Sequence, residues 1–234
     1  MDSPVYCNVG HPTGHPLVQR PRHPLLCVVE GRHDVEFLRR LSATLALFDP
    51  TLPDLGRLEC EGHLVFIPIG GGDVLSWSER FAPLGCPEFH LYDRELPPET
   101  EVRRAAAAGV NARAHCRTFL TTKRSLENYL HPLAILHAGG SSLEFDDDDA
   151  VAAGVARASF EAHCTTNDWN LLSRRARARF TNRAKRWLNT DAVEHQTPEL
   201  LAERDPQGEL LCWLRAIAAL LEHVPHDLML AASH

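Results

Sequence analysis

Residues 25–38 read LLCVVEGRHDVEFL, and this stretch predicts a buried strand, a tight turn and an amphipathic helix. The strand ends on Glu30, and Asp34 follows one helical turn later. A carboxylate at the end of an apolar run is costly to bury unless it has a partner. A hard divalent cation is the natural partner for two carboxylates that lie this close together.

Composition limits the classes of protein to consider. The chain has 234 residues, of which 44% are hydrophobic, so one domain of ordinary size, alone or with a helical appendage, is expected. Its net charge of −7 excludes a globally basic nucleic-acid binder, and such a role would need a local basic patch. The seven cysteines are scattered without a CxxC pair, which favours a reduced, cytoplasmic chain without disulfides. No apolar run is long enough to span a bilayer, so no membrane association is expected.

Three parts of the chain differ in their patterns. Residues 1–24 are rich in proline and show little periodicity, so an irregular N-terminal arm is expected. Residues 25–135 alternate between apolar runs and helical patterns, which predicts an α/β domain with a mostly parallel sheet flanked by helices. Residues 136–234 are expected to form a helical extension, all-helical from Ala150 onward. The expected strands are 25–29, 63–69, 88–92 and 112–119, and the main expected helices are 33–47, 73–80, 99–108, 198–204 and 208–222, with a loop at 49–62.

Several polar residues fall where the expected strands end. Glu30 follows the first strand, Gly70–Gly72 follow the second, and Asp93 and Glu95 follow the third. Ligands of parallel sheets bind at the carboxyl ends of the strands, so these residues are expected at one edge. The glycines are read either as a tight turn or as a close backbone approach to a phosphate. A further carboxylate, Glu127, lies in a short predicted helix.

The chemistry follows from five carboxylates that could converge: Glu30, Asp34, Asp93, Glu95 and Glu127. Asp93 and Glu95 alternate along an expected extended segment, which would let both face one ion. Clustered carboxylates repel one another, and a divalent cation removes that penalty. Mg²⁺ or Mn²⁺, as one or two ions, fits these oxygen ligands, and two ions stabilise the attacking and leaving oxygens of a phosphodiester.

A run of cations supplies matching electrostatics. Between residues 171 and 188 there are seven basic residues and no acidic ones. They are Arg174, Arg175, Arg177, Arg179, Arg183, Lys185 and Arg186. Alone, this run would be read equally well as a solvated helix face, but beside an acidic metal site it favours binding of a phosphate backbone.

Together these motifs resemble a known family. The pattern VEGxxDxxFL at 29–38, the glycine turn at 70–72 and Asp93-Arg94-Glu95 resemble the TOPRIM domain of topoisomerases, bacterial primases and a set of nucleases. The stretch LENYL at 126–130 is similar to an element of the overcoming-lysogenization-defect (OLD) nucleases and their stand-alone relatives in phage defence. The resemblance implies a Rossmann-like α/β unit that binds Mg²⁺.

The resemblance also implies roles for particular residues. Glu30 would be the metal-binding general acid/base, and Lys185 would stabilise the transition-state phosphate. Asp93 would be both a catalytic residue and a metal ligand. The other implied metal ligands are Asp34, Glu95 and Glu127.

Two departures from the family qualify this prediction. The third-strand motif is Asp-x-Glu where the family has Asp-x-Asp, which changes the reach of the second ligand. OLD proteins carry an ATPase, whereas this sequence contains no GxxxxGK[ST] motif. We therefore expect either a stand-alone protein or one that acts with a separately encoded ATPase. A homodimer would be common for such proteins.

The expected activity is an Mg²⁺- or Mn²⁺-dependent endonuclease that hydrolyses phosphodiesters of DNA or RNA, with tRNA among the candidates. The alternative is a non-catalytic module that binds nucleic acid or a partner ATPase. Primase or topoisomerase chemistry is disfavoured, because the chain has no candidate zinc-binding domain. Its three tyrosines, Tyr6, Tyr92 and Tyr129, are not in a convincing nucleophile setting.

Overall fold

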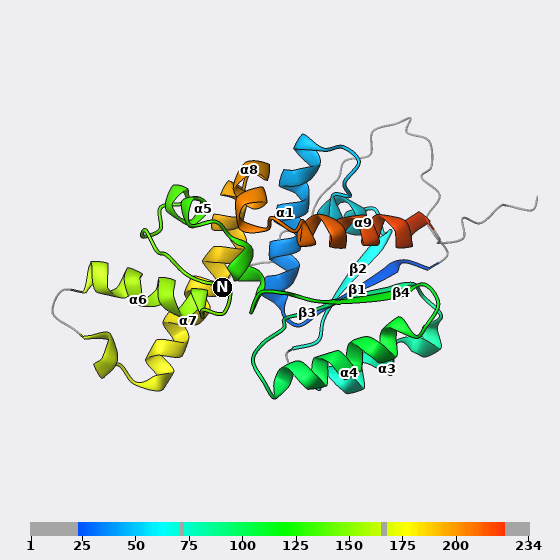
Figure 1. Ribbon diagram of the computed structural model, residues 1–234, viewed down its shortest axis with the longest axis horizontal. Helices are drawn as coiled ribbons and strands as arrows, with labels where there is room; N and C mark the ends of the chain where they lie inside the picture. The colour runs from blue at the N-terminus through cyan, green and yellow to red at the C-terminus, as the bar shows by residue number, and fades with distance from the viewer. Residues whose placement is uncertain (1–22, 71–72, 165–167, 223–234) are drawn as a thin grey trace, which may run out of the picture.

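A four-stranded parallel sheet forms the centre of the computed structural model, which describes residues 23–70, 73–164 and 168–222 (Figure 1). The strand order is β2-β1-β3-β4. The predicted α/β class with a parallel sheet and flanking helices is therefore confirmed. The predicted irregular arm, apart from its last two residues, lies outside the described residues. The strands are β1 (Leu25–Val29), β2 (Leu64–Pro68), β3 (Glu88–Tyr92) and β4 (Cys116–Leu120).

Every residue of β1 is buried, because helices cover both faces of the sheet. Successive side chains alternate between the faces. Cys27 and Val29 thus join one hydrophobic cluster, while Val28 joins a second cluster with Tyr92. In Figure 1, α1, α2 and α9 lie on one side of the sheet and α3 and α4 on the other. Their bounds are α1 Arg32–Phe48, α2 Leu55–Cys60, α3 Val74–Arg80, α4 Glu99–Asn111 and α9 Glu209–Glu222.

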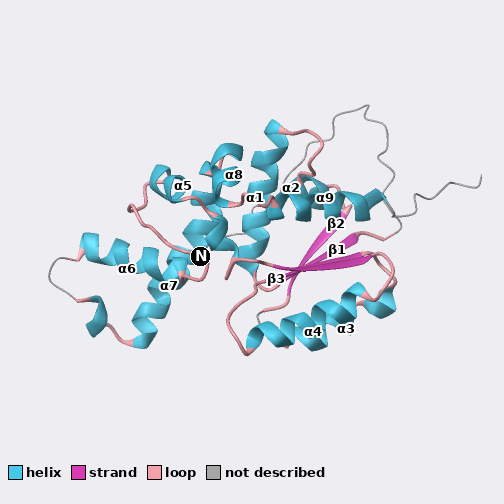
Figure 2. Cartoon of the chain, viewed as in Figure 1, coloured by secondary structure: helices cyan, strands magenta, loops and turns pink. Residues whose placement is uncertain are grey.

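The loop predicted at 49–62 is wrong in part, because α2 forms there (Figure 2). The Asp54 side chain accepts a hydrogen bond from the Arg57 amide at 3.0 Å and so caps the helix. Leu55 is fully buried, and its amide donates to Ser42 Oγ at 3.1 Å. A helix of six residues is too short to show a hydrophobic period, so capping and tertiary contacts decide its structure.

The second half of the chain is helical, as predicted: the elements described after Ala150 are all helices. Leu210, Leu214, Ile217 and Leu220 of α9 are buried, which assigns them to the core. Among the described residues no helix is long and apolar enough to cross a membrane. The elements not yet bounded are η1 (Ala82–Leu84), η2 (Leu126–Tyr129), α5 (Pro132–His137), α6 (Val151–His163), η3 (Trp169–Leu171), α7 (Arg174–Thr190), η4 (Ala192–His195) and α8 (Pro198–Arg204).

The helix α7 joins the two halves of the molecule. It packs against α6, where Phe160, Trp169 and Phe180 form an aromatic cluster, and against α1 beside the sheet (Figure 1). Leu188 of α7 shares one continuous hydrophobic cluster with Leu91 of β3. The C-terminal half of α7 therefore lies close to the edge of the sheet where β1 ends.

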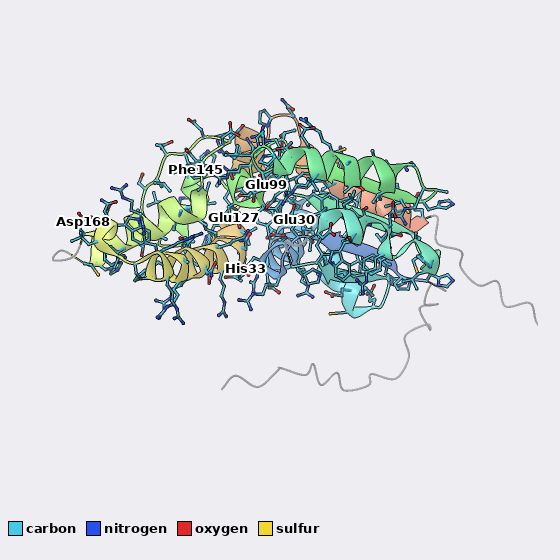
Figure 3. All side chains as sticks on the ribbon, turned by 90° about the horizontal axis from the view of Figure 1, so that it is seen from below. Glu30, His33, Glu99, Glu127, Phe145 and Asp168 are labelled. Atoms are coloured by element: carbon cyan, nitrogen blue, oxygen red, sulfur yellow. The ribbon has the colours of Figure 1, made fainter. Side chains whose placement is uncertain are left out.

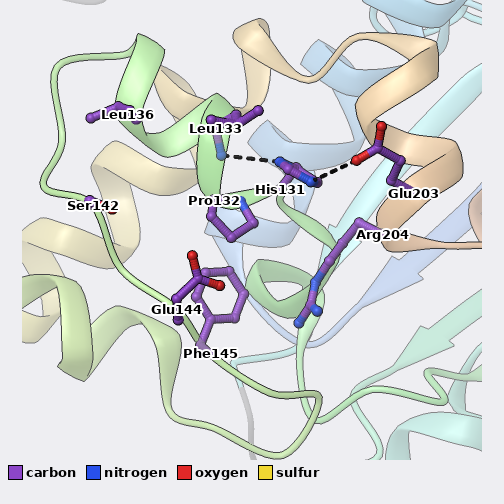
Figure 4. Close-up of a pocket in the computed structure, with 9 residues that line it drawn as sticks. All are labelled: His131, Pro132, Leu133, Leu136, Ser142, Glu144, Phe145, Glu203 and Arg204. Atoms are coloured by element: carbon purple, nitrogen blue, oxygen red, sulfur yellow. Dashed lines mark hydrogen bonds and ion pairs between the residues drawn. The ribbon is translucent and has the colours of Figure 1, made fainter.

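A clasp around Arg204 holds the segment that carries η2. Arg204 Nε donates to the Asn128 carbonyl at 2.8 Å, and its guanidinium lies 4.8 Å from the centre of the Phe145 ring. Arg204 and Lys123 both pair with Asp147, at 3.2 and 2.5 Å. A cavity of about 300 Å³ lies beside this clasp, where His131 Nε2 is 3.3 Å from Glu203 (Figure 4). These contacts fix the backbone around Glu127.

Candidate active site

The first two site residues are positioned by the ends of neighbouring strands. Glu30 comes directly after β1, and Asp93 comes directly after β3, which pairs with β1 in parallel. The Asp93 amide donates to Glu30 Oε1 at 3.1 Å. The Gly31 amide donates to Asp34 Oδ2 at 2.7 Å, which holds Asp34 in the first turn of α1. The predicted meeting of these carboxylates at one sheet edge is what the structure contains.

Glu30 is bound by an arginine that the sequence did not single out. Arg103 of α4 donates from Nε to Glu30 Oε1 and from Nη2 to Oε2, both at 2.7 Å. Both side chains are buried, at about a tenth of their possible exposure. Such a two-pronged ion pair fixes the orientation of the carboxylate as well as its charge. The two residues are 73 positions apart, so local sequence gives no sign of the contact.

Asp34 and Asp93 are buried carboxylates without a cationic partner of this kind. Burial raises the pKa of Asp34 to about 6, although the charge of Lys185 acts in the opposite direction. Burial, followed by the negative charge of Asp34, raises the pKa of Asp93 well above its usual range. The Asp93 carboxylate forms no hydrogen bond or ion pair within the described part of the chain. Burial therefore makes ionisation of either acid less favourable in the folded chain than in water.

The third corner of the site comes from η2 and α7. Glu127 Oε1 accepts from Asn189 Nδ2 at 2.6 Å and lies 3.4 Å from Lys185 Nζ, while Ser125 Oγ donates to Glu127 Oε2 at 2.8 Å. Burial alone would raise the pKa of Glu127, but Lys185 and Asn189 together lower it. Burial opposes the charge of Lys185, yet Glu127 and Asp34 raise the pKa of its ammonium group. Lys185 is therefore a charged residue beside the carboxylates, and its role at a transition-state phosphate stays a prediction.

Asn189 is a further residue that sequence reasoning missed. It is fully buried and lies one helical turn after Lys185, a spacing that places both side chains on the same face of α7. That spacing was the available signal. Its Oδ1 atom and Asp34 Oδ1 are both buried without a hydrogen-bond partner among the described residues. Unpaired buried oxygens are costly, so the site has acceptors to offer a ligand.

The donor set fits a hard divalent cation. Glu30, Asp34, Asp93 and Glu127 are opposed by two cations, Arg103 and Lys185, which leaves two negative charges when all are ionised. Carboxylate and amide oxygens are the ligands that Mg²⁺ and Mn²⁺ prefer. However, no three His, Cys, Asp or Glu side chains in the described ranges are gathered closely enough to hold a metal. Glu30 and Glu127 are held by Arg103 and Asn189 instead.

Two other predicted features are placed differently from the carboxylate cluster. The prediction of an extended segment through Glu95 is wrong. The φ angle of Glu95 is +51°, a left-handed conformation that turns the backbone. The Glu95 carboxylate lies 3.8 Å from Arg124 Nε and is partly exposed, so its metal role stays a prediction. Gly70 has a φ of +81°, as a tight turn requires, whereas residues 71–72 lie outside the description.

The predicted nucleic-acid-binding arginines lie on α7. They are all exposed, whereas Ala184 and Leu188 of the same helix are buried. These arginines are Arg174, Arg175, Arg177, Arg179, Arg183 and Arg186. Figure 3 labels His33 near Glu30 and Glu127, in the middle of the molecule. Partial burial, then the charges of Arg32 and Lys185, lower the pKa of His33, while the charge of Glu127 opposes them.

Comparison with known proteins gives structural neighbours only. No protein-family model matches the chain, and no curated protein matches it significantly. Among solved structures, the iodine-phased C-terminal region of the Xanthomonas campestris pv. campestris OLD protein aligns with a TM-score of 0.46 at 15% identity, covering 86% of this chain and 99% of that one. The mercury-phased structure of the same region gives 0.44 at 16% identity, covering 86% and 98%.

Proposed function

We propose that this chain is a divalent-metal-dependent nuclease with a TOPRIM-type site, hydrolysing phosphodiester bonds of DNA or RNA. The observation that carries the proposal is the pair Asp34 and Asp93. These acids are buried together at the carboxyl edge of a parallel sheet, and their pKa values are raised by burial. A divalent cation would remove that penalty, and Mg²⁺ or Mn²⁺ suits the oxygen donors.

Each residue of the site has a role in this proposal. Asp34 and Asp93, with the free oxygen of Asn189, would hold the ion. Glu30 would be the general acid/base, and Arg103 orients it beside them through hydrogen bonds to both carboxylate oxygens. Lys185 presents its ammonium group to the same space and would bind the phosphate. When bound, the ion would supply positive charge to the attacking and leaving oxygens.

The substrate and partners are part of the same proposal. The α7 arginines would bind the phosphate backbone by charge, which does not depend on sequence. The resemblance to OLD nucleases suggests a role in phage defence, a separately encoded ATPase partner and a homodimer. In this proposal DNA and RNA, including tRNA, are all candidate substrates.

A non-catalytic binding module is the second candidate, and two observations favour it. Both oxygens of Glu30 accept hydrogen bonds from Arg103, which leaves that carboxylate little freedom to bind a metal. In addition, the described residues contain no group of three His, Cys, Asp or Glu side chains arranged to hold a metal ion. Under this candidate the site would be a structural charge cluster, and the α7 arginines would bind nucleic acid without cutting it.

Cleavage assays separate the two candidates. The full chain would be incubated with supercoiled DNA and with total tRNA, each with Mg²⁺ or Mn²⁺. We expect cleavage by the wild type and a loss of about 100-fold or more in Asp93→Asn, which keeps the shape but removes the charge. Glu101→Gln, an exposed carboxylate on α4, is the matched control and should cut normally. Binding without cleavage by the wild type would favour the non-catalytic module, and equal cleavage by Asp93→Asn would refute the site.

A further inference from the structure

A second concave site lies beside the carboxylate cluster, between the start of α1 and the end of α7. It is a cavity of about 460 Å³. We call it the α1–α7 cavity, and it is lined by Arg32, His33, Glu36, Arg40, Arg186 and Thr190. Basic side chains from two helices that are far apart in the sequence thus converge on one space.

The charges around this cavity are only partly balanced. Arg40 pairs with Glu194, and its Nε lies 3.6 Å from Glu36, which leaves Nε buried without a hydrogen bond in the described structure. Arg32 and Arg186 are exposed, and neither forms an ion pair with another described residue. Glu36 also lines the cavity, but its carboxylate pairs with Arg39 at 2.9 Å and lies 3.6 Å from Arg40. The guanidinium groups of Arg32 and Arg186 thus face the cavity without an ion-pair partner of their own among the described residues, which makes it a site for an anion. Arginine matches phosphate best, because its planar fork binds two oxygens at once.

The position of the cavity relates it to the proposed chemistry. Arg32 and His33 directly precede Asp34 on α1, and Arg186 directly follows Lys185 on α7. Neighbouring residues on each helix therefore line two adjacent spaces. One space holds the carboxylates and Lys185, and the other holds the arginines. A strand with its reactive phosphodiester at the first space would bring an adjoining phosphate to the second.

We propose that the α1–α7 cavity binds a backbone phosphate of the nucleic acid next to the phosphodiester at the carboxylate cluster. This inference rests on the proposed function, since it takes the ligand to be a nucleic-acid strand. It assigns the contact to Arg32, which the sequence did not suggest, and to Arg186. It does not assign it to Arg174 and Arg175 at the opposite end of α7, which are equally exposed but do not line the cavity.

Binding without turnover tests the inference. A fluorescein-labelled single-stranded DNA oligonucleotide, and its RNA counterpart, would be titrated with the full chain in EDTA while fluorescence anisotropy is measured. Salt would be varied between about 50 and 200 mM, where backbone contacts weaken steeply. Each phosphate contact to a single strand contributes about 0.7 to the slope of log affinity against log salt. We expect the double variant Arg32→Gln/Arg186→Gln to reduce the slope by about 1.4 and to weaken binding about tenfold or more.

The matched control is the double variant Arg57→Gln/Arg157→Gln, which removes the same charge from exposed arginines on α2 and α6, away from α7. It should keep the wild-type slope. An unchanged slope in the Arg32/Arg186 variant, an equal loss in the control, or no binding by the wild type would overturn the inference. Failure of the nuclease proposal is a separate result. If the Arg32/Arg186 variant shows the reduced salt slope but the wild type never cuts, the α1–α7 cavity still binds phosphate and only the nuclease proposal fails. If the wild type cuts but the Arg32/Arg186 variant keeps the wild-type slope, the inference about the cavity fails.

Discussion

The ion pair between Glu30 and Arg103 determines what the first carboxylate of the site can do. Glu30 Oε1 accepts hydrogen bonds from both Arg103 and the Asp93 amide, so the side chain has a single orientation. Arg103 remains charged at any ordinary pH. The pair therefore offsets one of the four negative charges at the sheet edge. Arg103 is a positioning residue in this arrangement.

Removing Arg103 should destabilise the protein. Arg103→Gln leaves the buried Glu30 carboxylate without its cation, and breaking a buried pair in this way costs about 3–5 kcal/mol. Urea unfolding at neutral pH would measure the loss. The neighbouring variant Arg104→Gln is the control, because Arg104 is exposed and its pair with Glu101 contributes little.

The double variant Glu30→Gln/Arg103→Gln tests whether the loss comes from the unpaired Glu30 charge. It removes both charges, so most of the stability lost in Arg103→Gln should return. Equal stability of Arg103→Gln and Arg104→Gln would contradict the role given to this pair.

At the residue scale, the carboxylates were predictable and their partners were not. Glu30 and Asp93 stand directly after apolar strands, a position that is visible in the sequence. Arg103 and Asn189 reach the site across 73 and 62 positions, through the packing of α4 and α7. Glu95 was misplaced because nothing in the local sequence required its left-handed backbone.

At the scale of single elements, β3 carries a buried polar network on one face. Glu88, His90 and Tyr92 alternate along the strand, with His90 Nε2 2.7 Å from Glu88 and His90 Nδ1 2.6 Å from the Tyr92 hydroxyl. Arg113 binds both oxygens of Glu88, at 2.5 and 2.9 Å. The network links the start of β3 to Tyr92, the residue before Asp93.

This network predicts a loss of stability in mild acid. Burial lowers the pKa of His90, so the unfolded chain takes up a proton more readily than the folded one. The stabilisation is then present above the ordinary histidine pKa of about 6.5 and is lost as the pH falls through it. Burial opposes the hydrogen bonds from His90 and Arg113, but those bonds lower the pKa of Glu88, whose contribution disappears at still lower pH.

Urea unfolding between neutral pH and mild acid would measure this effect. The free energy of unfolding should fall more steeply with acidification in the wild type than in His90→Gln. His137→Gln, at an exposed histidine, should keep the wild-type dependence. The comparison uses the change with pH, so a uniform loss of stability in His90→Gln does not affect it. Equal dependence in the wild type and His90→Gln would contradict the prediction.

Elements with strong periodicity were predictable, whereas those set by capping and side-chain contacts were not. The bounds of β1 and β3 agree with the prediction. The run in β1 is continuously apolar, and in β3 polar and apolar residues alternate with the period of a strand. The fourth strand begins at Cys116, four residues later than predicted. There α4 continues to Asn111, whose Oδ1 accepts from the Thr118 amide at 2.8 Å and fixes the turn. Burial of Val110 and a side-chain contact together move that boundary, although Gly109, Val110 and Asn111 have low helix propensity.

At the scale of the whole molecule, the site depends on both halves of the chain. The sheet supplies Glu30 and Asp93, while α7 supplies Lys185 and Asn189. One hydrophobic cluster runs from β3 through α7 to α9, so the two halves bury a common core. The predicted division into a catalytic domain at 25–135 and an extension at 136–234 stays a prediction. In the structure, the residues that contact the carboxylate of Glu127 from the extension are Lys185 and Asn189 of α7.

Charge is also organised at this scale. The chain carries a net charge of −7, yet α7 presents arginines to solvent and shares a basic cavity with α1. Acidic side chains are buried at the sheet edge, and basic ones surround it. This separation would suit the proposed function, with a cation bound inside and a phosphate backbone outside.

Direct measurement of Mn²⁺ binding tests the central claim, which is that these carboxylates form a divalent-cation site. The full chain would be titrated with Mn²⁺ while the electron paramagnetic resonance signal of the free ion is recorded, for wild type, Asp93→Asn and Glu101→Gln. We expect the wild type and Glu101→Gln to reduce the signal of the free ion alike. Asp93→Asn should bind Mn²⁺ at least about tenfold more weakly, which corresponds to a loss of about 1.4 kcal/mol in binding free energy. Absence of binding by the wild type, or equal binding by Asp93→Asn, would contradict the claim.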